Sequence, residues 1–152
     1  MSDVVLYEVA DRVATITLNR PEARNALSRE VIRLLPELVV RADADPDVDV
    51  VILTGADPAF CAGVDLKELG ATNAIPGLGA DAKEPTSDAG DLDSRPGPFP
   101  TIAKPVIGAV NGVAVTGGFE LALNCDLLIA SDRARFADTH CRIGVQPGWG
   151  LT

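Results

Sequence analysis

The chain has 152 residues, 47% hydrophobic and 23% charged, so it has the length and apolar content of one folded domain and not the composition of a disordered chain. Its 22 acidic and 13 basic side chains give a net charge of −9, which disfavours nucleic acid or an anionic membrane surface as a partner. No uncharged run is long enough to cross a bilayer, and the first residues include Asp3 and Glu8 where a signal peptide would be basic, so we expect neither a membrane span nor export.

The first part of the chain predicts a hairpin, a helix and a buried strand. Residues 4–9 and 13–18 are rich in β-favouring side chains and flank a short polar connection. Ser28 is the expected N-cap of a helix whose apolar residues recur at helical spacing, with a kink or restart at Pro36. Residues 48–53 form an apolar run typical of a strand covered on both faces. A helix followed by such a strand indicates an α/β fold.

Residues 71–100 interrupt this pattern with four glycines and five prolines, and almost no large apolar side chains. This composition predicts a mobile loop or lid within the domain, or a surface insertion with no role of its own. Beyond it, apolar runs at 105–110, 113–115 and 127–130 predict strands, and residues 119–124 predict a helix.

Cysteine usage indicates a reducing compartment. The three cysteines, Cys61, Cys125 and Cys141, are an odd number without the paired spacing of a disulfide framework or a zinc site. We therefore expect free thiols, no metal centre and a cytoplasmic location.

Two glycine clusters stand where a predicted strand passes into a helix. One is at Gly63, and the other is the pair Gly117 and Gly118. A helix start leaves unpaired backbone N–H groups, and two such starts that converge on one carbonyl oxygen would form an oxyanion hole. Taken alone, each cluster is equally compatible with a turn that needs unusual backbone angles.

Glu120 is the only charged residue among the 21 from 105 to 125. A solvated helix face would normally carry more charge, so this position favours burial. Burial shifts a carboxyl group towards its protonated form, which suits a general acid or base at neutral pH. The alternative is a glutamate on the exposed stripe of an otherwise buried helix.

Several segments together resemble the enoyl-CoA hydratase/isomerase, or crotonase, superfamily. They are, in chain order, Asn-Arg-Pro at 19–21, Asn-Ala-Leu at 25–27, residues 60–67, Ala-Val-Asn-Gly at 109–112, Gly-Gly-Phe-Glu-Leu-Ala at 117–122 and Cys-Asp at 125–126. The resemblance implies an α/β fold of the ClpP/crotonase type, a spiral of repeated β-β-α units. It also implies chemistry in which two backbone amides polarise the thioester carbonyl of an acyl-CoA and stabilise its enolate.

Within this family pattern, Val64 and Gly117 match the positions of the two oxyanion amides. Glu120 matches the first catalytic glutamate of the hydratases. The second catalytic glutamate falls at His140, the only histidine of the chain. This is a departure from the family, although histidine can also exchange a proton near neutral pH. The resemblance therefore predicts Glu120 and His140 as the acid–base pair.

The resemblance also implies a binding path for coenzyme A. Its members are Ala62, Val64, Asp65, Leu66, Lys67 and Gly117, with Arg24 and Arg20 as candidate partners of the phosphates. For the arginines the alternative is solvated surface charge.

Two further positions carry expectations. Thr116 stands where many relatives have a third glycine, and a positive φ angle there would strain it. Cys141 is not expected to act as a nucleophile with His140, because adjacent side chains on a helix or strand diverge.

The family pattern implies an enzyme that hydrates a 2-enoyl-CoA, with coenzyme A entering as part of the substrate and no separate cofactor. Double-bond isomerisation is the enzymatic alternative, and a non-catalytic acyl-CoA-binding or association module is the other. Residues 147–152 resemble the middle of a family member, so residues 1–152 are expected to form the core domain without the family's C-terminal helical region. The full-length protein would be a homotrimer or a dimer of trimers.

Overall fold

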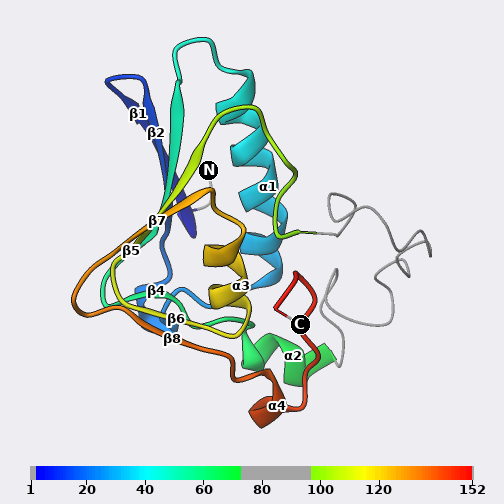
Figure 1. Ribbon diagram of the computed structural model, residues 1–152. Helices are drawn as coiled ribbons and strands as arrows, with labels where there is room; N and C mark the ends of the chain where they lie inside the picture. The colour runs from blue at the N-terminus through cyan, green and yellow to red at the C-terminus, as the bar shows by residue number, and fades with distance from the viewer. Residues whose placement is uncertain (1–2, 73–96, 152) are drawn as a thin grey trace, which may run out of the picture.

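The computed structural model describes residues 3–72 and 97–151, which form two β-sheets and the helices that follow their strands (Figure 1). The larger sheet has the strand order β1-β2-β3-β5-β7, and the smaller has the order β4-β6-β8. β1 and β2 are antiparallel, and every other neighbouring pair is parallel. The elements are β1 (Val5–Ala10), β2 (Val13–Leu18), the 3-10 helix η1 (Pro21–Ala23), α1 (Arg29–Ala44), β3 (Val50–Gly55), β4 (Ala59–Cys61), α2 (Leu66–Thr72), β5 (Val106–Val110), β6 (Val113–Val115), α3 (Gly117–Leu123), β7 (Leu127–Ala130), β8 (Arg135–Ala137) and α4 (His140–Ile143).

The chain repeats one unit three times. A strand of the larger sheet leads into a strand of the smaller sheet and then into a helix, as β3-β4-α2, β5-β6-α3 and β7-β8-α4. The expected spiral of β-β-α units is therefore confirmed. The loop predicted at 71–100 lies mostly outside the described residues.

The N-terminal hairpin is confirmed with a tighter turn than expected. Ala10 pairs with Val13, so only Asp11 and Arg12 connect the strands. Both have positive φ angles, 49° and 65°, the combination that matches a two-residue turn to the right-handed twist of the strands.

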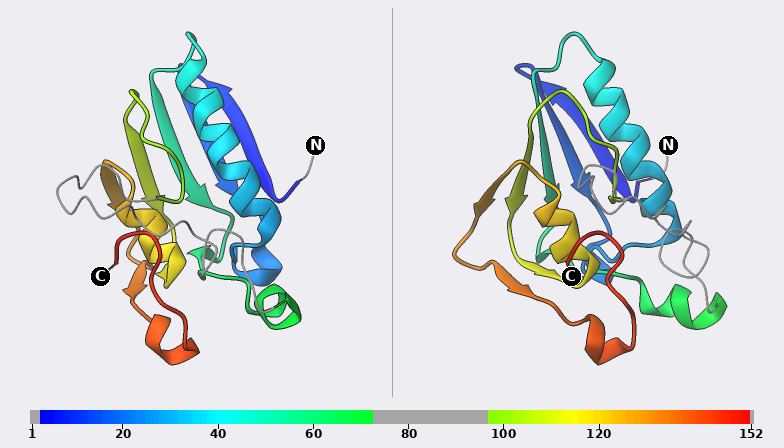
Figure 2. Two further views of the ribbon diagram at one scale, coloured as in Figure 1. Left: turned by 90° about the vertical axis from the view of Figure 1, so that its right-hand side faces the viewer. Right: turned by 45° about the vertical axis from the view of Figure 1, so that its right-hand side comes forward.

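The predicted helix is confirmed from its cap onward. The hydroxyl of Ser28 accepts a hydrogen bond of 3.3 Å from the amide of Val31, and the buried side of α1 packs on the larger sheet (Figure 2). The restart expected at Pro36 was wrong, because α1 runs unbroken from Arg29 to Ala44. Proline removes one backbone hydrogen bond, and burial of Leu35 and Val39 on either side holds the helix together.

The buried strand is displaced from its expected position and is covered more fully on one face than on the other. β3 covers Val50–Gly55 instead of 48–53. Val51 and Leu53 are buried towards α1, whereas Ile52 on the opposite face is half-buried. The prediction that both faces of this strand are fully covered is therefore not met within the described residues.

The smaller sheet positions the chemistry. Because β4, β6 and β8 are parallel neighbours, the segments that follow them and begin α2, α3 and α4 meet at one edge. Gly63 and Gly118 permit this approach. A Cβ on Gly63, whose φ is +84°, would lie 2.8 Å from the Cβ of Thr116, and a Cβ on Gly118 would clash with the carbonyl of Cys61.

No helix in the described part of the chain is long and apolar enough to cross a bilayer.

Candidate active site

Val64 and Gly117 contribute two of the backbone N–H groups at this edge that have no acceptor within the described ranges. Val64 lies opposite Leu27 in a parallel bridge, in which the amide of Leu27 donates to Gly63 O and Leu27 O accepts from the amide of Asp65. The amide of Val64 itself therefore points away from Leu27. The other free N–H belongs to Gly117, the first residue of α3, where a helix leaves its amides unpaired.

The structure brings these two amides into neighbouring segments. A Cβ on Gly63, the residue before Val64, would lie only 3.1 Å from the nitrogen of Gly117. Both donors belong to the backbone, so valine in place of a smaller residue at 64 removes neither. The two amides predicted to form an oxyanion hole therefore lie on adjacent segments.

Glu120 lies on the buried side of α3 with no exposed surface. The expectation of burial is confirmed, and the alternative of an exposed stripe was wrong. Its Oε1 accepts a hydrogen bond of 2.7 Å from the amide of Trp149. Its Oε2 makes no hydrogen bond within residues 3–72 and 97–151, and lies 3.3 Å from Nε2 of His140.

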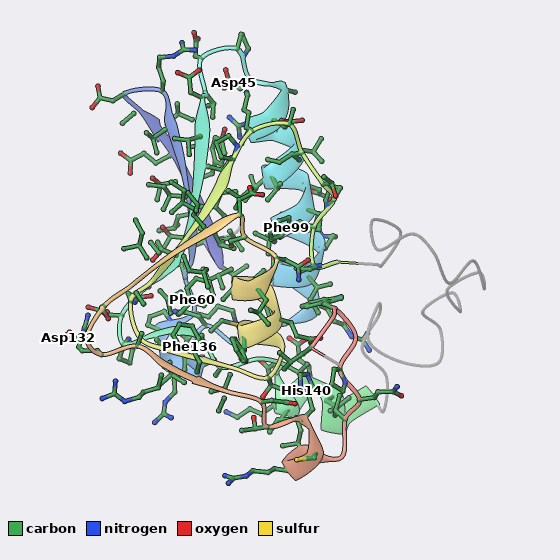
Figure 3. All side chains as sticks on the ribbon, in the orientation of Figure 1. Asp45, Phe60, Phe99, Asp132, Phe136 and His140 are labelled. Atoms are coloured by element: carbon green, nitrogen blue, oxygen red, sulfur yellow. The ribbon has the colours of Figure 1, made fainter. Side chains whose placement is uncertain are left out.

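His140 is the first residue of α4 and is 1% exposed (Figure 3). The structure therefore places the chain's only histidine against Glu120, as the family pattern implied. On its other side, Nδ1 lies 2.7 Å from Oδ1 of Asp138, and the amide of His140 donates to the same oxygen at 3.0 Å. These hydrogen bonds lower the pKa of Asp138 below its usual value. Cys141 is exposed while His140 is buried, which confirms that the two side chains diverge.

Thr116 joins the oxyanion segment to the histidine segment. Its φ is 55°, so the condition under which threonine is strained at this position is met. Its amide donates to Ala137 O at 3.1 Å, and its hydroxyl lies 2.5 Å from the hydroxyl of Thr139. The strained residue is thus fixed to β8 and to the start of α4.

Two of the residues predicted to contact coenzyme A, Asp65 and Arg20, pair with each other in the structure. The carboxylate of Asp65 accepts hydrogen bonds from Arg20 at 2.8 Å and from the amide of Lys67 at 3.1 Å, and it is buried. Arg20 also donates to Ala26 O at 2.7 Å. Both charged groups are therefore committed to holding the start of α2 against the N-terminal segment. Burial raises the pKa of Asp65, but hydrogen bonds from Arg20 and two helix amides outweigh it and leave the pKa below its usual value.

The other candidates differ in exposure, and two of them, Val64 and Gly117, are buried. Arg24, Leu66 and Lys67 are exposed, and Ala62 is half-buried. The amide of Ala62 donates to Arg24 O at 3.0 Å, so these two segments run side by side. The side chain of Arg24 has no hydrogen-bond partner in the described part of the chain, and is available to a ligand.

Sequence reasoning missed Asp138, Trp149 and Asn124. The side-chain Nδ2 of Asn124 donates to Glu120 O at 2.9 Å and to Trp149 O at 3.2 Å, which brings the C-terminal segment onto α3. The spacing Asp-Thr-His at 138–140 was a readable signal for the first of these. Trp149 acts through its backbone, and no sequence signal points to it.

Comparisons with known proteins agree with the geometry. The family model for enoyl-CoA hydratase/isomerase matches residues 8–152. The chain is 44% identical over 140 residues to a probable peroxisomal enoyl-CoA hydratase 1 of Arabidopsis thaliana, covering 92% of this chain and 49% of that protein. It is 38% identical to the short-chain-enoyl-CoA hydratase of Clostridium acetobutylicum, covering 97% of this chain and 54% of the other.

Solved structures give the same result for the fold. The crystal structure of enoyl-CoA hydratase from Mycobacterium tuberculosis H37Rv is 50% identical in sequence, with a TM-score of 0.79. The match covers 98% of this chain and 56% of that one. The chain thus spans about half the length of the relatives it matches.

Proposed function

The chain belongs to the enoyl-CoA hydratase/isomerase family, and on that premise we propose that it adds water to the double bond of a 2-enoyl-CoA thioester. The observation that carries this proposal is the buried pair of Glu120 and His140, 3.3 Å apart. The pair lies beside a helix start whose first amide is free. A proton-exchanging pair next to an anion-stabilising site is what conjugate addition to a thioester requires.

In the proposed reaction, the thioester oxygen accepts hydrogen bonds from the amides of Val64 and Gly117. This withdraws electrons from the double bond and makes its β-carbon electrophilic. The oxygen of water forms a bond to that carbon while the pair takes one of its protons, and negative charge moves to the thioester oxygen as an enolate. The pair then delivers a proton to the α-carbon, which yields a 3-hydroxyacyl-CoA. In other enzymes a single oxyanion donor is worth roughly 3–4 kcal/mol.

The substrate's nucleotide end would follow the exposed segment around Ala62, Leu66 and Lys67, with Arg24 near its phosphates. Coenzyme A enters as part of the substrate, so the reaction needs no separate cofactor. We place the protein in the cytoplasm because its three cysteines are free thiols. The family pattern further suggests a homotrimer or a dimer of trimers. The exposed apolar side chains of Leu127 and Ile129 on β7 are compatible with self-association.

Crotonyl-CoA in oxygen-labelled water, with the full protein, tests the reaction. Formation of a 3-hydroxybutyryl-CoA that carries the label supports hydration. Conversion of a 3-enoyl-CoA to its 2-enoyl isomer, without labelled hydration of crotonyl-CoA, would favour isomerisation instead. Binding of acyl-CoA without turnover of either substrate would indicate a binding module.

A further inference from the structure

The surroundings of the His140 ring determine which of its nitrogens carries a proton. Oδ1 of Asp138 receives the amide of His140 at 3.0 Å and faces Nδ1 at 2.7 Å. An ionised carboxylate accepts hydrogen bonds and has none to donate, so Nδ1 must be the donor. The Asp138 side chain is 48% exposed and its pKa lies below the usual value, both of which favour the ionised form.

This tautomer has a consequence on the opposite side of the ring. In a neutral imidazole with a proton on Nδ1, Nε2 carries only a lone pair. Nε2 lies 3.3 Å from Oε2 of Glu120, and neither atom has a hydrogen-bond partner within the described ranges. Both side chains are at least 98% buried. Two lone pairs facing each other at this distance in a buried site would repel, so one proton between the two atoms stabilises the arrangement.

We propose that Asp138 is a positioning residue that keeps the proton of His140 on Nδ1 and directs a bare Nε2 at Glu120, so that the pair holds a single shared proton. The catalytic consequence rests on the proposed hydration, whereas the tautomer does not. Asp138 itself does not touch the reacting atoms. It acts through the ring, and its negative charge stabilises the imidazolium whenever the shared proton resides on Nε2.

The shared proton balances the proposed reaction. As the water oxygen bonds to the β-carbon, the pair accepts the proton that water releases, and it then gives one proton to the α-carbon of the enolate. The pair thus ends each turnover with the one proton with which it began. In the other tautomer, a bare Nδ1 would face Oδ1 of Asp138 at 2.7 Å with no proton between two acceptors.

Nitrogen NMR of the full protein with labelled histidine tests the tautomer without reference to activity. The signals of His140 are those that disappear in His140→Gln. We expect a proton-bearing Nδ1, and an Nε2 whose shift is that of a bare or a proton-sharing nitrogen. A neutral ring with its proton on Nε2 and a bare Nδ1 would overturn the proposal.

The variants Asp138→Ala and Asp138→Asn test the positioning role. Asp138→Ala should shift the ring towards the Nε2–H tautomer and lower kcat by roughly tenfold to a hundredfold, with little change in KM. Asp138→Asn keeps an acceptor oxygen without the charge and should recover part of the tautomer signal and part of kcat. The matched control is Asp132→Asn, because Asp132 is an exposed residue of the same segment that lies far from His140 (Figure 3).

Each outcome decides one claim. If Asp138→Ala leaves both the tautomer and kcat unchanged, Asp138 does not position the ring. If the wild-type protein shows the expected tautomer, Asp138→Ala loses it and no hydration is detected, the positioning stands and the proposed reaction fails. Circular dichroism shows whether each variant is folded. The nitrogen NMR spectrum of the wild-type protein is enough by itself to refute the proposed tautomer.

Discussion

The amide of Trp149 donates a hydrogen bond of 2.7 Å to Oε1 of Glu120, a residue 29 positions earlier in the chain. One oxygen of the buried carboxyl group is therefore occupied by the backbone, and the other is directed at His140. The two oxygens therefore differ: Oε1 fixes the orientation of the side chain, and Oε2, which has no hydrogen-bond partner in the described residues, is the atom to which we assign proton exchange.

Glu120→Gln should preserve this orientation and remove the chemistry. The carbonyl oxygen of glutamine can still accept from Trp149, but its amide cannot exchange a proton with substrate. We expect kcat for hydration to fall by roughly 10²–10⁴ while KM changes little. Steady-state kinetics measure this effect, with Glu30→Gln on the exposed side of α1 as the control. Equal kcat in Glu120→Gln and wild type would refute the acid–base role.

His140→Glu restores the residue type of the hydratases but should not restore their pair. The new carboxyl group would face Glu120 on one side and Asp138 on the other. We expect the free energy of unfolding to fall by about 1–3 kcal/mol, because the buried carboxyl group of Glu120 would face a second carboxyl group in place of the imidazole of His140. Adding Asp138→Asn should recover part of this loss, because it removes one repelling charge.

A double-variant cycle in chemical denaturation measures this coupling. Independent effects of His140→Glu and Asp138→Asn would show that the two side chains do not interact in the way described.

Two variants of Thr116 separate its strain from its hydrogen bond. Thr116→Val keeps a β-branched side chain at a φ of 55° and loses the contact with the hydroxyl of Thr139. Thr116→Gly loses the same contact but relieves the backbone. We expect Thr116→Gly to be more stable than Thr116→Val by about 1–3 kcal/mol in thermal unfolding. Equal stability would mean that this backbone conformation carries no strain.

Acid should weaken the contact between Arg20 and Asp65. The pKa of Asp65 in the folded protein lies below its usual value, so the unfolded chain binds more protons in acid. The resulting stabilisation is complete above about pH 4 and is lost as pH falls through the lower folded-state pKa. Asp65→Asn should therefore cost about 2 kcal/mol at neutral pH, with a smaller difference in acid.

Denaturation of wild type, Asp65→Asn and the control Asp132→Asn at several pH values checks this. A gap between wild type and Asp65→Asn that does not narrow below about pH 4 would contradict the prediction.

The three thiols should differ in reactivity. Burial raises the pKa of Cys61 to about 12, and burial also raises that of Cys125 to about 12, whereas Cys141 is exposed. Only a thiolate reacts with an alkylating reagent, so Cys141 should be modified first at neutral pH. Peptide mass spectrometry over time measures this order, and denaturant should make all three thiols reactive. Labelling of Cys61 as fast as Cys141 in the folded chain would contradict its burial.

The fold could be predicted where an element is long or has a repeating pattern. The apolar spacing of α1 and the apolar runs at β2 and β5 depend on local side-chain periodicity, which a single sequence displays. The short strands β4 and β8 and the helix α4 contain three or four residues each, too few to display a period. Their existence depends on pairing between distant segments.

The candidate site divides in the same way. The burial of Glu120 was predicted because an isolated charge in an apolar stretch is visible in the sequence. The proximity of His140 was implied only by the family resemblance, since it arises from the parallel pairing of β6 with β8. The pairing of Asp65 with Arg20 was not predicted, because a sequence does not reveal that two charged side chains contact each other inside the protein.

The edge of the smaller sheet combines two kinds of group that respond differently to mutation. In the proposed reaction, the thioester oxygen is bound by main-chain amides, which a point mutation leaves in place, whereas one proton-exchanging partner is the single side chain of His140 at the start of α4. On this proposal, a histidine can occupy the position of the second glutamate, with Asp138 two positions earlier to orient it, while the amides of Val64 and Gly117 are unchanged. Substitutions at position 140 would then alter proton transfer without altering the carbonyl-binding amides.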